Sequence, residues 1–248
     1  MLAIYKRELQ GYFYSPIAYI FIGIFALLAG IVFTMNNTWA GSANFNGMLG
    51  NMTFLFMIVV PILTMRLLSE ERKNKTDQLL LTSPASISSI VMGKYFAALT
   101  VFVITLVITF MYPVILFIYG NPSISEIFSG YLGYLFLGAA LIAVGVFISA
   151  LGENQIVSAF VTLGVLFAIW LGSNLLDLLT SLVGSIQIGF LQWIADRLID
   201  VLEWLSVYNR FTPFSKGLFS VTDVFYYLSF AAVFVFLTIR TIESRRWR

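Results

Sequence analysis

The sequence contains neither cysteine nor histidine. Without cysteine the chain forms no disulfide and no thiolate metal site. Without histidine it has no imidazole ligand, no histidine-based catalysis and no histidine pH switch. Charge is also scarce, because 10% of the residues are charged, whereas soluble domains carry about 25%. These shortages exclude thiol and imidazole chemistry and argue against a soluble domain.

Apolar residues are abundant instead, at 60% of the 248 residues. A soluble core of this size cannot bury so much apolar surface, so the predicted fold class is all-α, a polytopic membrane protein. We expect a single transmembrane domain over residues 1–248, without a cleavable signal at its start. Its six spans are predicted at about residues 17–34, 52–68, 93–119, 127–151, 156–176 and 224–239, with a polar loop at 35–51.

Prolines lie inside two of these spans. Pro61 is in the second and Pro113 in the third. Proline lacks the N–H that would bond to the preceding turn, so we expect kinks whose freed carbonyls are satisfied by neighbouring helices.

Two segments outside the spans are amphipathic. Residues 3–15 include Tyr5, Lys6, Arg7 and Glu8 and predict a helix lying in the membrane interface; the alternative is a charged flank that only sets topology. The region 177–222 is predicted to form external helices, with an amphipathic helix within 190–207. Whether 177–205 is re-entrant or lies on the surface is left open.

The distribution of basic residues predicts the orientation. With the N-terminus in the cytoplasm, the cytoplasmic segments, counted with Arg66 and Lys94 at their rims, carry 11 of the 14 Lys and Arg residues. This fits the tendency of Lys and Arg to stay on the cytoplasmic side. Because the number of spans is even, both termini are predicted to be cytoplasmic.

Motifs for chemistry are missing. The sequence has no G-x-x-x-x-G-K-[ST], no G-x-S-x-G and no H-E-x-x-H pattern. No charge lies at mid-depth in any predicted span, as a proton- or ion-coupled carrier would need. The chain is therefore predicted not to be an enzyme, to hold no cofactor and to bind no nucleic acid. If it moves a substrate, the energy is expected to come from a partner.

The loop at residues 69–92 stands between two long uncharged stretches, 9–65 and 95–125. It contains Glu70, Glu71 and Arg72, and then a second group: Thr76, Asp77, Leu79, Leu80, Leu81, Ser83 and Pro84. Leucines in a polar loop need a partner surface or the membrane. We therefore predict a short docking helix, ended at the Ser83-Pro84 pair, which suits the start of the next helix. The alternative is an ordinary charged loop that enforces topology.

These residues resemble ABC-2-type transporter permeases, most closely the subgroup with the gliding-motility permease and the permease of nitrous-oxide-reductase maturation. The family pattern is a Glu-Arg/Lys cluster, Gly-Thr-acidic-x-Leu-Leu, a proline, and a Gly-Lys pair entering the third span. Here these are Glu70 to Lys73, Thr76 to Leu80, Pro84 and Gly93-Lys94. Lys75 stands where the family commonly has glycine.

The resemblance implies a permease subunit of an ATP-driven exporter in a prokaryotic plasma membrane. Two permease chains, identical or paralogous, would pair, and separate ATPase chains would bind ATP and Mg. Residues 70–84 would be the main coupling helix, Glu153 and Asn154 a second contact, and 3–15 an elbow helix. The 177–216 region would close the outer side, and an accessory protein with an extracellular domain is a further expected partner. The resemblance does not identify the substrate.

Polar residues within the spans are candidates for lining a pathway: Thr105, Thr109, Ser149, Ser158, Thr162, Ser173 and Asn174. Against this, Ser and Thr in membrane helices usually bond to their own backbone or to neighbouring helices. Gly133, Gly138 and Gly145 are expected to allow close helix packing rather than to contact substrate.

Two other functions remain open on the sequence alone. One is a membrane anchor or assembly component that recruits a cytoplasmic partner without transport. The other is a secondary transporter or channel. Copurification with an ATPase distinguishes them from the permease.

Overall fold

A computed structural model describes residues 1–39, 45–76, 86–120, 122–183, 197 and 206–246. Every regular element among these residues is helical. Six helical stretches are long and apolar enough to cross a membrane: Ile17–Trp39, Gly47–Lys73, Ile87–Tyr119, Ile124–Leu151, Gln155–Leu175 and Val221–Arg245. The predicted all-helical, polytopic fold is confirmed.

The first half of the chain is built from short pieces. Helix α1 (Leu2–Tyr14) precedes α2 (Ile17–Phe33), which continues as a π-helix (Thr34–Trp39). Next come α3 (Phe45–Met52), a 3₁₀ turn (Thr53–Leu55), α4 (Phe56–Thr64) and α5 (Ser69–Lys73). The prediction of a loop over 35–51 was therefore wrong for most of that segment. Polar asparagines lowered its hydropathy, but helices can accommodate them: Asn36 Nδ2 donates to the Val32 carbonyl at 2.9 Å, and Asn51 Nδ2 donates to Asn36 Oδ1 at 2.8 Å.

The second half has longer helices. These are α7 (Ile87–Thr109), α8 (Met111–Tyr119), α9 (Ile124–Leu151) and α10 (Gln155–Val183). After a 3₁₀ turn (Asn209–Phe211) and the short α12 (Thr212–Ser215), α13 (Val221–Arg246) ends the described chain. Helix α10 continues the fifth span through residues 177–183. The predicted amphipathic helix within 190–207 lies mostly outside the described residues.

Pro113 breaks the third span as predicted. Helix α7 ends at Thr109 and α8 begins at Met111, with Pro113 in its first turn. The Thr109 carbonyl, which has lost its partner four residues on, accepts a hydrogen bond from the Tyr131 hydroxyl of α9 at 3.0 Å. A neighbouring helix thus satisfies the carbonyl that proline leaves free.

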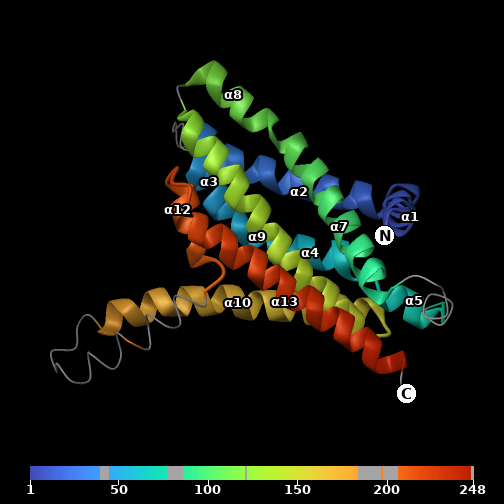
Figure 1. Ribbon diagram of the computed structural model, residues 1–248. Helices are drawn as coiled ribbons and strands as arrows, with labels where there is room; N and C mark the ends of the chain where they lie inside the picture. The colour runs from blue at the N-terminus through green and yellow to red at the C-terminus, as the bar shows by residue number, and fades with distance from the viewer. Residues whose placement is uncertain (40–44, 77–85, 121, 184–196, 198–205, 247–248) are drawn as a thin grey trace.

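Helix α9 is the centre of the bundle. Figure 1 shows it running between α7 and α13, and its apolar window is 78% buried, against 22% for the window in α10. Three glycines let neighbours approach its backbone. A Cβ atom at Gly133 would lie 2.5 Å from Phe214 Cβ, one at Gly138 would lie 3.0 Å from a Phe56 ring carbon, and one at Gly145 would overlap Thr64. The expected packing role of these glycines is confirmed.

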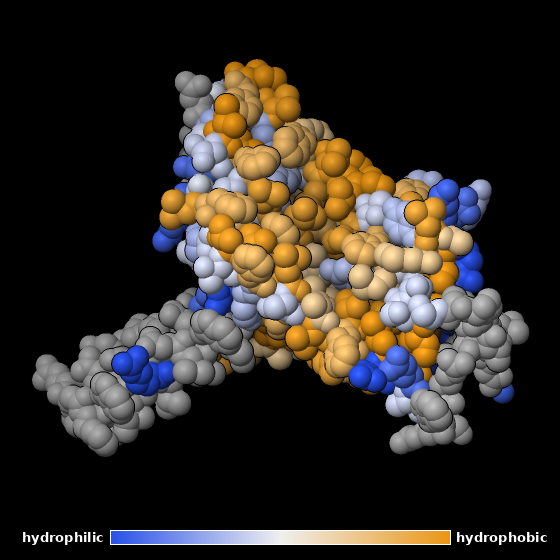
Figure 2. Space-filling model, viewed as in Figure 1, coloured by the Kyte–Doolittle hydropathy of each residue, from blue (hydrophilic) through white to orange (hydrophobic). Residues whose placement is uncertain are grey.

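The two ends of the bundle differ. One end carries α1, α5 and the C-terminal turns of α13, and the other carries α8, α3 and α12 (Figure 1). On the face seen in Figure 2, the surface between the ends is mostly apolar, and hydrophilic residues gather toward the ends. This pattern suits a bundle whose middle faces lipid.

Candidate functional site

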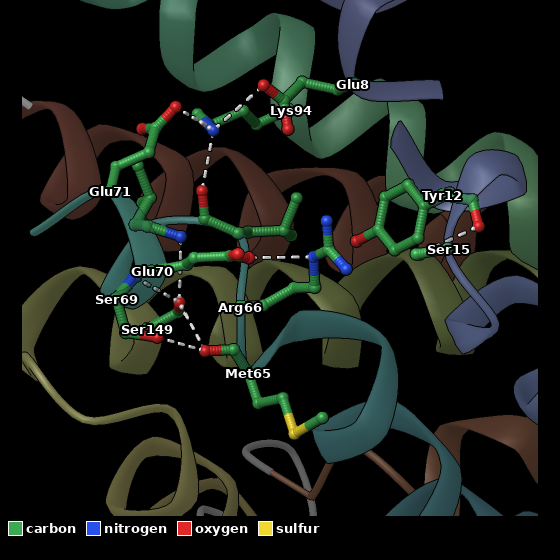
Figure 3. Close-up of polar contacts among 12 residues, drawn as sticks. Glu8, Tyr12, Ser15, Met65, Arg66, Ser69, Glu70, Glu71, Lys94 and Ser149 are labelled. Atoms are coloured by element: carbon green, nitrogen blue, oxygen red, sulfur yellow. Dashed lines mark hydrogen bonds and ion pairs between the residues drawn. The ribbon is translucent and has the colours of Figure 1, made fainter. Parts of the chain in front are cut away.

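The candidate site lies at the end of the bundle that carries α1 and α5. Its central residue is Lys94, the eighth residue of α7, whose side chain is 1% exposed. The Lys94 ammonium lies 3.2 Å from a Glu8 oxygen of α1 and 2.9 Å from a Glu71 oxygen of α5. It also donates to the Leu67 carbonyl at 2.7 Å (Figure 3). One buried cation therefore joins α7 to α1 and to the segment 67–71.

The packing of α1 against α7 brings these charges together. At Gly93, beside Lys94, an added Cβ would lie 3.1 Å from the Ile4 side chain and 3.3 Å from the Tyr5 nitrogen. The Tyr5 hydroxyl lies 3.0 Å from Thr100 Oγ1 of α7. The Gly-Lys pair thus combines a close helix approach with a charge that holds the approaching helix. Lys6 of the same helix is exposed.

Arg7 and Tyr12 complete the connection between α1 and its neighbours. Arg7 pairs with Glu8 at 2.7 Å and with Glu71 at 3.2 Å. The buried Tyr12 hydroxyl donates to the Leu63 carbonyl at 2.6 Å. Burial raises the pKa of the Tyr12 phenol, so that it stays protonated and keeps this hydrogen bond.

A second ion pair joins the two segments predicted to contact a partner. Arg72 of α5 lies 2.5 Å from Glu153, in the turn between α9 and α10, and donates to the Leu151 carbonyl at 2.8 Å. In the same turn Asn154 Oδ1 accepts the Ile156 N–H at 2.9 Å, which caps α10. Residues from 70–76 and from 152–154 therefore form one continuous surface.

Lys75, which stands where the permeases that the sequence resembles commonly have glycine, lies just beyond the end of α5. The Thr76 N–H donates to the Glu71 carbonyl at 2.9 Å and the Lys75 N–H to the Arg72 carbonyl at 3.1 Å. This is the Schellman pattern that ends helices at a residue in the left-handed conformation, usually glycine. Lys75 has a φ of 57°. The backbone turn that suits glycine is therefore kept with a lysine in it.

A polar pocket of about 610 Å³ lies between α1 and α5. Arg7, Arg66 and Lys94 line it together with Glu8, Glu70 and Glu71. Arg66 pairs with Glu70 at 3.0 Å (Figure 3). Because three basic residues face three acidic ones, the charges of the pocket balance.

The proposed site residues fall into three groups. Glu71 and Arg72 face inward to Lys94 and to the α9–α10 turn, whereas Glu70, Thr76, Glu153 and Asn154 are more exposed. Asp77, Leu79, Leu80, Leu81 and Pro84 lie outside the described residues, as does Ser83. The described part of the next helix begins at Ile87, where the Ser86 side chain accepts the Ser89 N–H as its N-cap.

The hydroxyls proposed for a pathway bond mostly within their own helices. Thr105, Thr109, Thr162 and Asn174 donate to the carbonyls of Val101, Leu106, Ser158 and Trp170, respectively. Ser158 Oγ is buried and has no hydrogen-bond partner among the described residues. The bonds of the two helical threonines in α7, of Thr162 and of Asn174 are the ones expected if these residues only bond to their own backbone. A role in lining a pathway stays a prediction.

Lys94 and Ser149 have roles that sequence reasoning missed. Lys94 was placed at the rim of its span, although a lysine eight residues inside an apolar helix was a usable signal of a buried partner. Ser149 was considered only for a pathway. Its hydroxyl instead bonds to the backbone between α4 and α5 (Figure 3), and no pattern in the sequence indicated that contact.

Comparison with known proteins gives the family. Residues 12–169, more than half of the chain, match the family model described as "ABC-2 family transporter protein". No curated protein matches the sequence. Members of this family are membrane components of transport systems and are typically not catalytic, and membership implies an ABC ATPase partner. The chain therefore belongs to the ABC-2 transporter family, as a multi-pass membrane permease subunit.

Proposed function

We propose that this permease subunit belongs to an exporter and that its separate ATPase docks on the segment 70–84. The observation that carries the proposal is the ion-paired surface at one end of the bundle, where Arg72 joins α5 to Glu153 at 2.5 Å. A segment that receives force has to be held firmly by the membrane helices. Lys94, with bonds to Glu8, Glu71 and Leu67, supplies such a hold.

The same surface supports the division of roles within the segment. Glu71 and Arg72 bond inward, so their part is to position the segment, whereas the partner would meet the exposed residues and the leucines Leu79 to Leu81. ATP and Mg would be bound by the ATPase. Its closure on ATP would displace α5 and the helices joined to it.

The arrangement of the ends supports the proposed orientation. Arg7 near the N-terminus pairs with Glu71, and Arg245 near the C-terminus donates to the Ala150 carbonyl beside the α9–α10 turn. Both ends of the chain thus lie with the proposed docking surface, which would face the cytoplasm of a prokaryotic cell. A second permease chain, identical or paralogous, and the subgroup of gliding-motility and nitrous-oxide-reductase-maturation permeases remain part of the proposal.

Copurification tests the proposed docking. The permease is coproduced with the products of its neighbouring genes and purified in mild detergent. We expect the wild type to retain the ATPase. Leu80→Asp is expected to reduce retention about tenfold, because a docked apolar side chain is worth about 1.5–3 kcal/mol. Arg240→Gln, in an exposed pair in α13, is the control and should retain the ATPase fully.

The outcomes separate the competing functions. A wild-type permease that brings down no ATPase overturns the proposal and favours a secondary transporter or channel. An anchor without transport would retain the ATPase but leave its rate of ATP hydrolysis unchanged by the permease. Full retention by Leu80→Asp would overturn the assignment of the docking segment.

A further inference from the structure

The helix that joins the second span to the docking segment is interrupted at residues 65–68, between α4 and α5. In a continuous helix the Leu68 N–H would donate to the Thr64 carbonyl and the Ser69 N–H to the Met65 carbonyl. Here both N–H groups donate to Ser149 Oγ of α9, at 3.1 and 3.3 Å. The Ser149 hydroxyl donates in turn to the Met65 carbonyl at 3.3 Å (Figure 3).

A second side chain holds the interruption from α7. The Leu67 carbonyl accepts a hydrogen bond from Lys94 Nζ at 2.7 Å. The groups that leave the helical ladder are thus satisfied by Ser149 and Lys94, and the Ser69 hydroxyl adds a bond to the Met65 carbonyl. A buried backbone group without a partner costs about 1–3 kcal/mol. The interruption is therefore specified by residues of other spans and not by the local sequence alone.

The backbone of α9 is shaped for this contact. Gly145 lies one turn before Ser149, and Thr64 occupies the space that a Cβ of Gly145 would take. Without that close approach the short serine side chain could not reach the backbone of the interruption. Beyond Ser149, the Arg72 side chain binds the Leu151 carbonyl and Glu153. Helix α5 therefore contacts α9 at Ser149 and at Leu151, and contacts Glu153 in the turn that follows α9.

We infer that Ser149 is a positioning residue, which sets the angle between α4 and α5 and so the direction in which the docking segment is presented. The role of Ser149 in setting this angle does not depend on the function. Its effect on how the docking segment meets the ATPase rests on the proposed function. Because α9 is the most buried span, a displacement of α5 by a partner would pass through this contact to the centre of the bundle.

Spin labels on the full chain test the inference, since the sequence has no cysteine to interfere. Asn74→Cys, at the end of α5, and Phe128→Cys, at the far end of α9, are exposed positions. The stretch of α9 between residues 128 and 151 is about 35 Å long at 1.5 Å per residue. Distances of this size between two spin labels can be measured by pulsed electron paramagnetic resonance. In lipid nanodiscs the pair should give one narrow distance distribution.

Ser149→Ala in the labelled chain is expected to broaden that distribution or add a second distance. Ser149→Thr, which keeps the hydroxyl, should restore the narrow one. Thr238→Val removes a buried hydroxyl that bonds within α13, and it should change nothing. An unchanged distribution in Ser149→Ala, or no rescue by Ser149→Thr, overturns the inference.

Hydrogen exchange of the unlabelled protein provides a second measurement, and its wild-type result alone already tests the inference. The Leu68 and Ser69 amides should be as protected as those of α4, and about tenfold less protected in Ser149→Ala, as loss of one buried bond implies. Fast exchange of these amides in the wild type overturns the inference.

ATPase copurification with the same variants separates this inference from the proposed function. If the wild type binds no ATPase, the proposed function fails. The spin-label distances then still test whether Ser149 sets the angle between α4 and α5. If Ser149→Ala has a broadened distribution but binds the ATPase and stimulates its hydrolysis as the wild type does, the consequence for docking is overturned.

Discussion

Lys75 occupies a backbone conformation that most side chains avoid. Its φ of 57° places it in the left-handed region, which costs a residue with a Cβ atom about 1–2 kcal/mol. The Schellman hydrogen bonds from Lys75 and Thr76 hold it there. These hydrogen bonds at the end of α5 fix the turn, and the lysine in it reduces the local stability.

Lys75→Gly is therefore expected to stabilise the end of α5 by about 0.5–1 kcal/mol, since glycine relieves the left-handed strain but gains freedom in the unfolded chain. Hydrogen exchange of the peptide that covers α5 should slow. Lys73→Gly, inside the helix, is the opposite control and should speed exchange, because glycine costs about 1 kcal/mol there. Faster exchange in Lys75→Gly would contradict the strain argument.

Lys94 is a different kind of residue, because its charge is fully buried and fully paired. Lys94→Met keeps the apolar stem but leaves the Glu8 and Glu71 carboxylates, 17% and 16% exposed, with Arg7 as the one cation for both of them. Removing one partner of a buried pair costs about 3–5 kcal/mol; because these carboxylates are partly exposed, we expect about 2–3 kcal/mol.

Thermal unfolding in detergent measures this loss. Arg240→Met breaks an exposed pair with Glu243 and should change stability by less than about 0.5 kcal/mol. Adding Glu8→Gln and Glu71→Gln to Lys94→Met should recover part of the loss, because the uncompensated charges are then gone. Equal stability of Lys94→Met and the wild type would show that Arg7 alone compensates the two carboxylates.

At the scale of elements, α9 organises the bundle through its small residues. Gly133 faces Phe214, Gly138 faces Phe102 and Phe56, and Gly145 faces Thr64. Each glycine admits a different neighbour, so α9 can pack against α12, α7 and α4 along its length. In lipid, where helices gain little from hydrophobic burial against one another, such close packing is a main source of association.

Gly133→Ala is expected to cost about 1–3 kcal/mol, because the new methyl would stand 2.5 Å from Phe214 Cβ and α12 would have to move. Gly164→Ala on α10 is the matched control. Nothing lies within 4 Å of a Cβ there, so the change should be neutral or stabilising. Thermal aggregation of the two variants, compared with the wild type, checks the difference. A Gly133→Ala protein as stable as the control would mean that α12 is loosely held.

For the whole molecule, the two ends have distinct polar structures. The end with α1 and α5 holds the Lys94 cluster and the Arg72–Glu153 pair. The opposite end has a pair of its own, Arg210 and Asp223 at 2.7 Å, with the Arg210 guanidinium 4.1 Å from the centre of the Tyr226 ring. Asp223 lies in the first turn of α13, whereas Lys94 is the eighth residue of α7 and depends on its paired carboxylates.

The proposed orientation predicts the reactivity of single cysteines. Lys216→Cys, exposed at the α12 end, should react with a membrane-impermeant maleimide in intact cells whose outer face is accessible. Asn74→Cys, at the other end, should react only in inverted vesicles. The reverse pattern would invert the topology and remove the docking surface from the cytoplasm.

The number of spans, the helix at the N-terminus and the position of the charged loop follow from the sequence alone. Long uncharged runs can be buried only in lipid, where backbone groups have to bond within helices, so composition alone leads to a helical bundle. It misjudged residues 35–51, because polar side chains that lower hydropathy also bond to helical turns. Local patterns also marked Pro113 and the glycines of α9 as special.

Which side chains contact one another became visible in the folded bundle. Lys94 binds Glu8, 86 residues earlier, and Leu67, 27 residues earlier, and Ser149 binds the backbone of residues 65–69. Such contacts depend on the angle and depth at which helices cross. Crossing geometry is set by the packing of many side chains at once and leaves no mark in the spacing of residues along one helix.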